Sequence, residues 1–264
     1  VRTAFSQYLA PEMVSRLAES SESLKLGGEK KNMTFLFSDI RGFTAISESY
    51  KSNPEELTEL INNLLTVLSN EILDNDGTID KYMGDCIMAF WNAPTDQENH
   101  TDLALKASFD MEKALEEFNI EFQKQKGMEL KIGIGINTGE CIVGNMGSEK
   151  RFDYTVLGDP VNLASRLEGQ SGTYGFQRIL GQETVNALKS NSDLFELDLI
   201  QVKGKSEPVK IYTSFDNFSL KGEKFAEFTH EHDEFLKNYR NQDWDKALNF
   251  IQKWEQQVTE FDLY

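Results

Sequence analysis

Short apolar runs alternate with longer amphipathic segments between residues 31 and 216, and this order constrains the fold more than any other feature of the chain. Apolar residues at every second position predict strands, and a period near 3.6 predicts helices. The order β-α-β-β-α-β with additions indicates a ferredoxin-like α+β fold with helices on one face of the sheet. The runs predict strands at 33–38, 78–82, 86–91, 130–137, 141–144, 151–157, 195–203 and 208–215, and helices at 54–73, 103–122 and 161–169.

Glycine-containing steps mark where these segments should turn or end. The Met-Gly-Asp step at 83–85 is expected to close a hairpin, and the Thr-Gly-Glu step at 138–140 a second one. Gly169 is expected to end the helix that starts at residue 161, because glycine favours the position after the last helical turn.

The two ends of the chain differ in character from its middle. Residues 1–17 show helical spacing, and the polar run at 20–31 is typical of a linker. Residues 217–264 show helical spacing twice and resemble one tetratricopeptide-type unit, which cannot bury its own apolar face and should pack on the main domain or on a partner. We therefore expect a helical lead and linker (1–30), a main domain (31–216) and a helical hairpin (217–264).

Composition excludes several classes of protein. The formal net charge of −17 argues against binding to nucleic acid or anionic lipid, because both are polyanions. Cys86 and Cys141 each lie in an apolar run, which favours reduced thiols in a cytoplasmic protein over a disulfide framework. No signal peptide or bilayer-spanning run is found in the sequence, and a start at Val1 in mid-pattern suggests a fragment, so that any membrane segment would lie before residue 1.

Two carboxylates stand at the ends of expected strands. Asp39 follows a buried strand and precedes a glycine turn, and Asp85 lies in the hairpin step at 83–85. For either residue alone a structural role is favoured, with Asp39 as a cap of the next turn and Asp85 as a residue of the hairpin turn. If their strands are neighbours, the two carboxylates converge and offer the oxygen ligands that Mg²⁺ prefers. The main-chain N–H groups of the glycine turn can face a phosphate.

Two other features do not predict sites. His230 and His232 lie in the tail without a matched third ligand, so zinc is not expected. The glycine-rich stretch at 133–147 lacks the GxxxxGK[ST] form of a phosphate-binding loop, and its glycines are expected to serve turns and close packing.

Four ordered motifs carry a family resemblance. They are FSDIRGFT at 37–44, GTIDKYMGDCIMAFW at 77–91, IGIGINTGECIVGNMGSEKR at 132–151 and YTVLGDPVNLASRLE at 154–168. The pattern resembles the catalytic domain of class III adenylate and guanylate cyclases over residues 31–216. The lead AFSQYLAPEMVSRL and the tail segment DWDKAL also resemble bacterial members, in which an extracytoplasmic sensor and a membrane anchor precede the cyclase. The resemblance implies a cytoplasmic domain of a membrane-anchored bacterial protein.

The resemblance implies roles for the residues that match the family pattern. Asp39 and Asp85 match its metal-binding aspartates, and the carbonyl of Ile40 matches a main-chain ligand, for two Mg²⁺ or Mn²⁺ ions per site. Asn162 matches the residue that orients the ribose, and Arg166 the one that stabilises charge on the α-phosphate in the transition state. The implied substrate contacts are the purine-reading Lys81 and Thr155, the phosphate-facing Gly42, Phe43 and Thr44, and Lys203 for the terminal phosphates.

The purine-reading positions favour ATP as substrate. A lysine ammonium only donates hydrogen bonds and adenine N1 accepts them, whereas family members that use GTP commonly carry Glu at the position of Lys81. The hydroxyl of Thr155 can accept from the adenine 6-amino group, and Thr at this position resembles a subgroup linked with bicarbonate stimulation. Two alternatives stay open: a guanylate cyclase that uses GTP, and a degenerate cyclase-like regulatory domain without catalysis.

The family builds each active site from two subunits. The resemblance therefore implies a head-to-tail homodimer with two shared sites, which converts ATP to 3′,5′-cyclic AMP and pyrophosphate. One subunit is expected to contribute Lys81 with Asp39 and Asp85, and its partner Thr155, Asn162 and Arg166.

Overall fold

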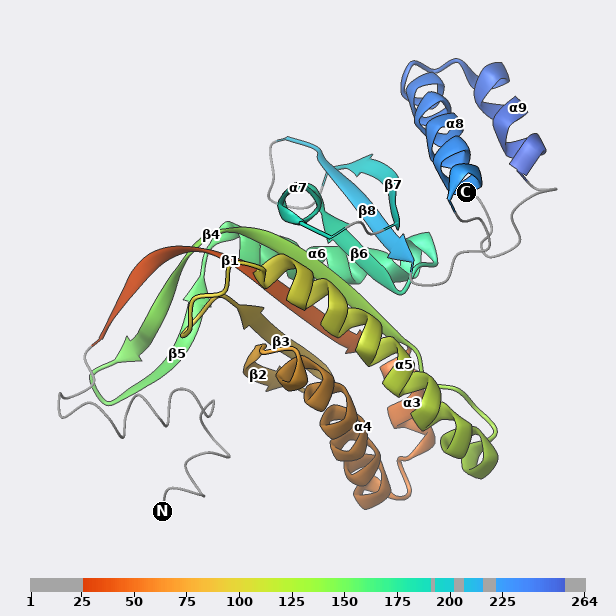
Figure 1. The fold of residues 1–264 in the computed structure, drawn as a ribbon. Coiled ribbons are helices and arrows are strands. Elements are labelled where there is room, and N and C mark those ends of the chain that lie inside the picture. Colours follow the sequence, from red (N-terminus) through yellow and green to blue (C-terminus); the bar gives the residue numbers. More distant parts are fainter. Residues whose placement is uncertain (1–25, 191–192, 202–206, 216–221, 255–264) are drawn as a thin grey trace.

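The computed structural model describes residues 26–190, 193–201, 207–215 and 222–254. The lead expected to be helical at 1–17 and the expected phosphate contact Lys203 lie outside these ranges. In chain order the described elements are β1 (Gly27–Ile40), α3 (Phe43–Ser49), α4 (Pro54–Asp74), β2 (Thr78–Met83), β3 (Cys86–Trp91), α5 (His100–Lys126), β4 (Ile132–Ser148), β5 (Arg151–Leu157), α6 (Asp159–Tyr174), β6 (Arg178–Gly181), α7 (Gln182–Ala187), β7 (Asp193–Ile200), β8 (Val209–Phe215), α8 (Glu223–Arg240) and α9 (Trp244–Trp254) (Figure 1).

The strands of the described residues form one eight-stranded sheet in the order β2-β3-β1-β4-β6-β8-β7, with β5 paired to β4 outside this path. β1 is antiparallel to both β3 and β4, so it has a hydrogen-bonded neighbour on each side. Its residues 33–38 are buried without interruption, which is typical of a strand covered on both faces. The predicted α+β class is confirmed.

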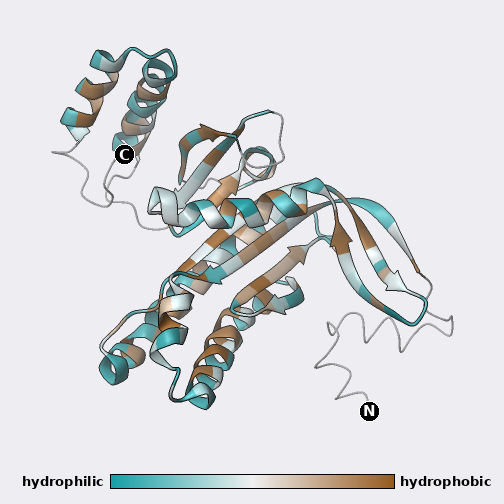
Figure 2. Cartoon of the chain, turned by 180° about the vertical axis from the view of Figure 1, so that it is seen from behind, coloured by the Kyte–Doolittle hydropathy of each residue, from teal (hydrophilic) through white to brown (hydrophobic). Residues whose placement is uncertain are grey.

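Helices cover both faces of this sheet, so the expectation of helices on one face is wrong. Side chains alternate along a strand, and Leu36 packs in the same cluster as residues of α4 and α5, whereas Phe37 packs in a cluster that includes α6. A Cβ at Gly135 of β4 would run into the backbone of α6, so glycine here allows that helix to lie close to the sheet. Figure 2 shows hydrophobic residues concentrated along the central strands between these layers.

β4 is one strand of 17 residues, so the hairpin turn expected at 138–140 is wrong. Thr138 is buried, and its hydroxyl lies 2.8 Å from that of Thr34 on β1, so a residue common in turns is satisfied within the sheet. β1 begins at Gly27, and its residues 27–32 pair with residues 140–145 of β4, although residues up to 31 were expected to be linker. With β5 these segments form an extended ribbon (27–32, 140–148 and 151–157) that projects from the sheet in Figure 1.

α6 is longer than expected at both ends. It starts at Asp159 with Pro160 in its first turn, continues through Gly169, and ends before Gly175, whose φ of 73° is the left-handed conformation that glycine favours. Gly169 therefore does not end the helix. A Cβ at Gly169 would meet nothing within 4 Å, so the residue lies on an open face of α6.

The C-terminal helices α8 and α9 pack on the main domain, as one of the two expected arrangements. Phe228 stacks on Phe195 of β7 with ring centroids 5.5 Å apart, and Trp254 meets Phe228 edge to face. His232 lies between them, 1% exposed, and burial lowers its pKa to about 3, so it is neutral and part of the core. Among the described helices, none has both the length and the apolar character that crossing a bilayer requires.

Candidate active site

The two predicted metal-binding carboxylates come together at the ends of neighbouring strands. β1 pairs with β3 up to Ser38 and Ile87, so Asp39 lies beside the β2–β3 turn that carries Asp85. The main-chain N–H of Ile40 lies 3.1 Å from Asp39 Oδ1 and 3.3 Å from Asp85 Oδ2. The two carboxyl groups therefore converge, as the sequence predicts.

This pair is suited to a divalent cation. Burial, together with the hydrogen bond and charge of Asp85, raises the pKa of Asp39 to about 7, and Glu168 adds to the rise. A cation between the carboxylates would remove the repulsion that raises this pKa. Among the described residues no group of three or more His, Cys, Asp or Glu could hold a metal ion, so further ligands would be main-chain, water or substrate oxygens.

Two neighbours of this pair were missed from the sequence, Arg41 and Glu168. Arg41 follows β1, and its guanidinium donates to the carbonyls of Ser171, at 3.0 Å, and Phe176. Burial raises the pKa of the Glu168 carboxyl, Arg41 counteracts the rise and Asp85 adds to it, so Glu168 belongs electrostatically to the metal pair. Both residues stand inside the quoted motifs, and that position was the signal that could have found them.

Lys81 and Thr155 both contact Asp80 within one chain, although they were expected to serve a site from different subunits. The hydroxyl of Thr155 on β5 donates to Asp80 Oδ2 at 2.6 Å, and the ammonium of Lys81 lies 3.8 Å from Asp80 Oδ1. Both purine-reading candidates therefore surround one carboxylate, that of Asp80, which the sequence analysis did not select. The extended ribbon makes this possible, because it carries β5 toward the β2–β3 hairpin.

The other two predicted catalytic residues share one helix. Asn162 and Arg166 lie four positions apart on α6, and Asn162 is exposed. Within the described part of the chain, Nη1 of Arg166 is buried and has no hydrogen-bond partner. A buried guanidinium nitrogen without an acceptor is costly, and a bound phosphate oxygen would satisfy it.

The predicted phosphate-facing segment begins a short helix. Gly42 has a φ of 70° and precedes α3, and its carbonyl accepts from the N–H groups of Ala45 and Ile46 at 3.0 and 3.2 Å. The N–H groups of Phe43 and Thr44 therefore lie in the first turn of α3, where no intrahelical acceptor is available. The side chain of Phe43 packs against the main core, so its role there is structural.

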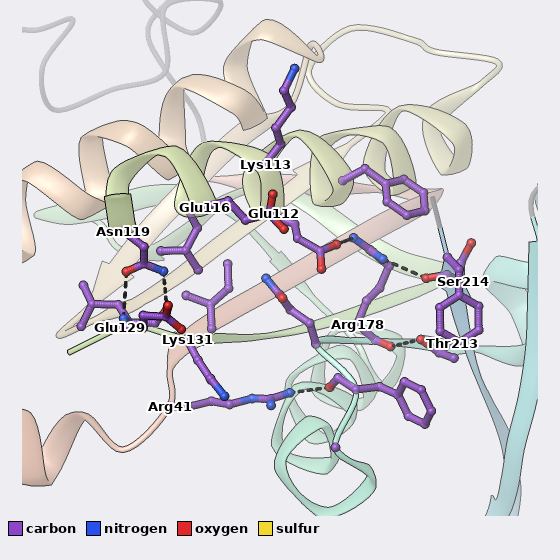
Figure 3. Close-up of a pocket in the computed structure, with 18 residues that line it drawn as sticks. Arg41, Glu112, Lys113, Glu116, Asn119, Glu129, Lys131, Arg178, Thr213 and Ser214 are labelled. Atoms are coloured by element: carbon purple, nitrogen blue, oxygen red, sulfur yellow. Dashed lines mark hydrogen bonds and ion pairs between the residues drawn. The ribbon is translucent and has the colours of Figure 1, made fainter. Parts of the chain in front are cut away.

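A cavity of about 690 Å³ lies beside Arg41, and none of the predicted site residues that the structure describes lines it (Figure 3). Its most buried cation, Arg178, was also missed from the sequence. The guanidinium of Arg178 donates to the Ser108 hydroxyl at 2.7 Å, to the Ser214 carbonyl at 2.9 Å and to Glu112 at 2.7 Å. These contacts tie α5 to β6 and β8, so we interpret Arg178 as a structural residue.

Cys86 lies next to Asp85 and is half-buried. Burial and the nearby carboxylates raise the pKa of its thiol to about 12, and burial raises that of the Cys141 thiol to about 11. Both cysteines are free thiols, as expected, and a protonated thiol is a poor nucleophile.

Comparisons with known proteins identify the family of this chain. The family model described as the adenylate and guanylate cyclase catalytic domain matches residues 27–215. An adenylate cyclase of Anabaena cylindrica is 36% identical over 219 residues, which cover 79% of this chain and 42% of that protein. Adenylate cyclase 1 of Rhizobium meliloti is 34% identical, over 79% of this chain and 31% of its own length. The chain thus spans less than half the length of these curated relatives.

Solved structures of cyclases are also similar to this chain. The adenylyl cyclase CyaB from P. aeruginosa is 38% identical with a TM-score of 0.67, and the match covers 75% of this chain and all of that chain. The guanylyl cyclase Cya2 is 36% identical with a TM-score of 0.66, over 74% of this chain and 99% of that chain. Since enzymes named for different purines match almost equally well, overall similarity identifies the family and individual residues must identify the purine. The chain belongs to the family of adenylate and guanylate cyclase catalytic domains.

Proposed function

We propose that this chain is the catalytic part of an adenylate cyclase, which converts ATP to 3′,5′-cyclic AMP and pyrophosphate. The observation that carries the proposal is the convergence of Asp39 and Asp85 at the ends of neighbouring strands, with the pKa of Asp39 raised to about 7. Relatives named adenylate cyclase at 34–36% identity support the same activity.

The reaction requires stabilisation of the charge that develops around the α-phosphorus atom. The ribose 3′-hydroxyl attacks the α-phosphorus, its O–H bond breaks, and the bond to pyrophosphate breaks as the new ester forms. Divalent cations, used generally in this family, would lower the pKa of the 3′-hydroxyl and neutralise phosphate charge. Asp39, Asp85 and the Ile40 carbonyl would hold two such ions per site, Mg²⁺ or Mn²⁺. Arg166 would stabilise the charge that develops on the α-phosphate oxygens.

Substrate positioning falls to the remaining polar residues. Asn162, four positions before Arg166 on α6, would orient the ribose so that the hydroxyl lies in line with the leaving group. The main-chain groups at Gly42, Phe43 and Thr44 would face the phosphates, and Lys203 would contact the terminal ones. Lys81 would donate to adenine N1, which favours ATP over GTP.

Each site is proposed to be shared between two copies of the chain. Thr155, Asn162 and Arg166 were expected from the partner of the subunit that holds the metal ions. The contact through Asp80 supports moving Lys81 to the same subunit as Thr155. One subunit would then supply Asp39 and Asp85, and its partner would supply Lys81, Thr155, Asn162 and Arg166.

Mixing inactive variants tests this division. Asp39→Ala chains mixed with Lys81→Ala chains should recover activity, since one site per mixed dimer then has wild-type metal ligands and wild-type purine contacts. Asp39→Ala mixed with Arg166→Ala should recover in the same way. Recovery only in the second mixture would contradict the reassignment of Lys81, and recovery in neither would contradict the shared site.

Product analysis tests the activity itself. The purified chain is incubated with ATP or GTP, each with Mg²⁺ and with Mn²⁺, and products are separated chromatographically. Faster formation of cyclic AMP supports the proposal, faster formation of cyclic GMP would make the chain a guanylate cyclase, and no product with either would favour a degenerate regulatory domain. The upstream sensor, the cytoplasmic location, the bicarbonate response and the division into 1–30, 31–216 and 217–264 stay predictions.

A further inference from the structure

Asp80 is a buried carboxylate placed between the two purine-reading candidates. Its side chain is 1% exposed, it accepts a 2.6 Å hydrogen bond from the Thr155 hydroxyl, and the Lys81 ammonium lies 3.8 Å away. Burial raises the pKa of Asp80, and both partners counteract the rise by favouring the ionised form. An acid buried at this cost needs its two partners, which are also the groups expected to read the base.

A bulge in β2 makes this arrangement possible. The register between β2 and β3 shifts between Ile79 and Lys81, so Asp80 is the extra residue. Ile79 packs in the core with α4 and α5, whereas Lys81 pairs with Met88, which belongs to the opposite face of the sheet. Bulges re-aim side chains in this way, and here the bulge lets consecutive residues serve one polar cluster.

The hydrogen bond from Thr155 to Asp80 determines whether the threonine hydroxyl can donate to a purine or only accept from it. A hydroxyl has one proton to donate and lone pairs to accept, so an unconstrained Thr155 could serve either purine. Adenine carries an amino group at position 6, which donates, and guanine carries a carbonyl there, which accepts. Because the Thr155 hydroxyl donates to Asp80, its proton is occupied and only its lone pairs remain available to another group. In that state it can accept from adenine and has no proton for guanine.

We propose that Asp80 is a positioning residue that determines purine specificity, by fixing the Thr155 hydroxyl as an acceptor and holding the Lys81 ammonium beside it. The inference rests on the proposed adenylate cyclase function and deepens it. Asp80 acts through Thr155 and Lys81 and need not touch the nucleotide.

The test compares kcat/KM for ATP and for GTP in the full chain. Asp80→Asn is nearly isosteric, but its amide can donate to Thr155 and so free the threonine proton for guanine. The ATP-to-GTP ratio is expected to fall about tenfold, the size of one hydrogen bond's discrimination. Asp153→Asn is the matched control, because it removes an exposed charge two residues from Thr155, and it should leave the ratio within about twofold.

A second variant separates positioning from a merely structural role. Thr155→Val removes the hydroxyl, so adding Asp80→Asn to it should change the ratio much less than in the wild-type background. Proportional loss of both activities in Asp80→Asn, with an unchanged ratio, would overturn the inference, as would equal effects of Asp80→Asn in both backgrounds. A wild-type enzyme that prefers GTP would instead overturn the proposed function, whatever Asp80→Asn does.

Discussion

Asp39 must lose its proton before it can hold a cation, and a pKa of about 7 places that step near neutrality. Burial is the largest cause of this pKa, and the carboxyl group of Asp85 is the next. The metal-free pair is therefore partly protonated at neutral pH, and ion binding competes with a proton at Asp39.

The first prediction concerns this competition. Mn²⁺ binding to the nucleotide-free enzyme should release about one proton per Asp39 at pH 6 and close to none at pH 8. Calorimetry in two buffers of different ionisation enthalpy measures that number. Asp39→Asn should bind Mn²⁺ more weakly, and any binding should occur without the release; equal proton release by wild-type enzyme at both pH values would contradict the prediction.

The second prediction is that the contribution of Asp39 to the stability of the metal-free protein falls as the pH rises. The folded chain binds the Asp39 proton up to about pH 7 and the unfolded chain only up to about 3.8, so this group's contribution falls as pH rises between those values. Asp39→Asn should therefore be more stable than the metal-free wild type at pH 8, by about 1 kcal/mol after screening by solvent, and the difference should vanish near pH 4. Thermal unfolding of the two proteins measures it.

Arg166 gives the third prediction. Since its buried Nη1 lacks an acceptor within the described residues, it is available to donate to the phosphate oxygens of the proposed substrate. Arg166→Ala should lower kcat by about 100-fold or more and change KM for ATP much less, as for other groups that act on transition-state charge. Arg240→Ala removes an arginine that pairs with Glu196, and its kcat should stay at the wild-type value. A change confined to KM in Arg166→Ala would contradict the assigned role.

At the scale of elements, contact between β4 and α6 depends on a missing side chain. Gly135→Ala would force a Cβ into the backbone of α6 at Ala164 and Glu168, so it should destabilise the fold by about 2–3 kcal/mol. Gly169→Ala on the open face of the same helix should stabilise it by about 0.5–1 kcal/mol. Chemical denaturation of the two variants measures both signs, and equal effects would contradict this account of the packing.

The elements differ in how far the sequence could predict them. The helices at 54–73 and 103–122 were predicted near their observed bounds because a single apolar face determines them locally. The turn predicted at 138–140 failed because its threonine and glycine serve contacts with β1 and α6, which no local pattern reveals. The prediction that Gly169 ends α6 was wrong, because an exposed glycine inside a helix looks the same in sequence as a glycine that ends one.

The residues of the candidate site also differ in whether the sequence could identify them. Asp39, Asp85, Asn162 and Arg166 could be selected because each stands in a motif with a chemical reason. Asp80 could not, because the contact that distinguishes it is with Thr155, 75 positions away along the chain. The proposed move of Lys81 to the subunit that supplies Thr155 rests on the same contact, which joins β5 to β2 only in the folded chain.

At the scale of the whole molecule, the C-terminal helices share a core with the sheet. Phe228 of α8 is buried between Phe195 of β7 and Trp254 of α9. Phe228→Ala should therefore destabilise the chain by about 3–4 kcal/mol, and the catalytic part and the helices should unfold in one transition. Leu248→Ala, at a side chain 52% exposed, should cost less than about 1 kcal/mol. Two separate transitions in the wild-type chain would contradict the shared core.

β1 and β4 are paired without interruption over 14 positions, from Gly27 and Asn145 in the extended ribbon to Ile40 and Ile132 beside the metal pair. Two paired strands are stiffer than one, so a rotation at one end of the pair moves the other end. β4 is about 55 Å long, and each degree of rotation about one of its ends displaces the other end by about 1 Å. The continuous pairing therefore couples the orientation of the extended ribbon to the position of Asp39 at the other end of β1.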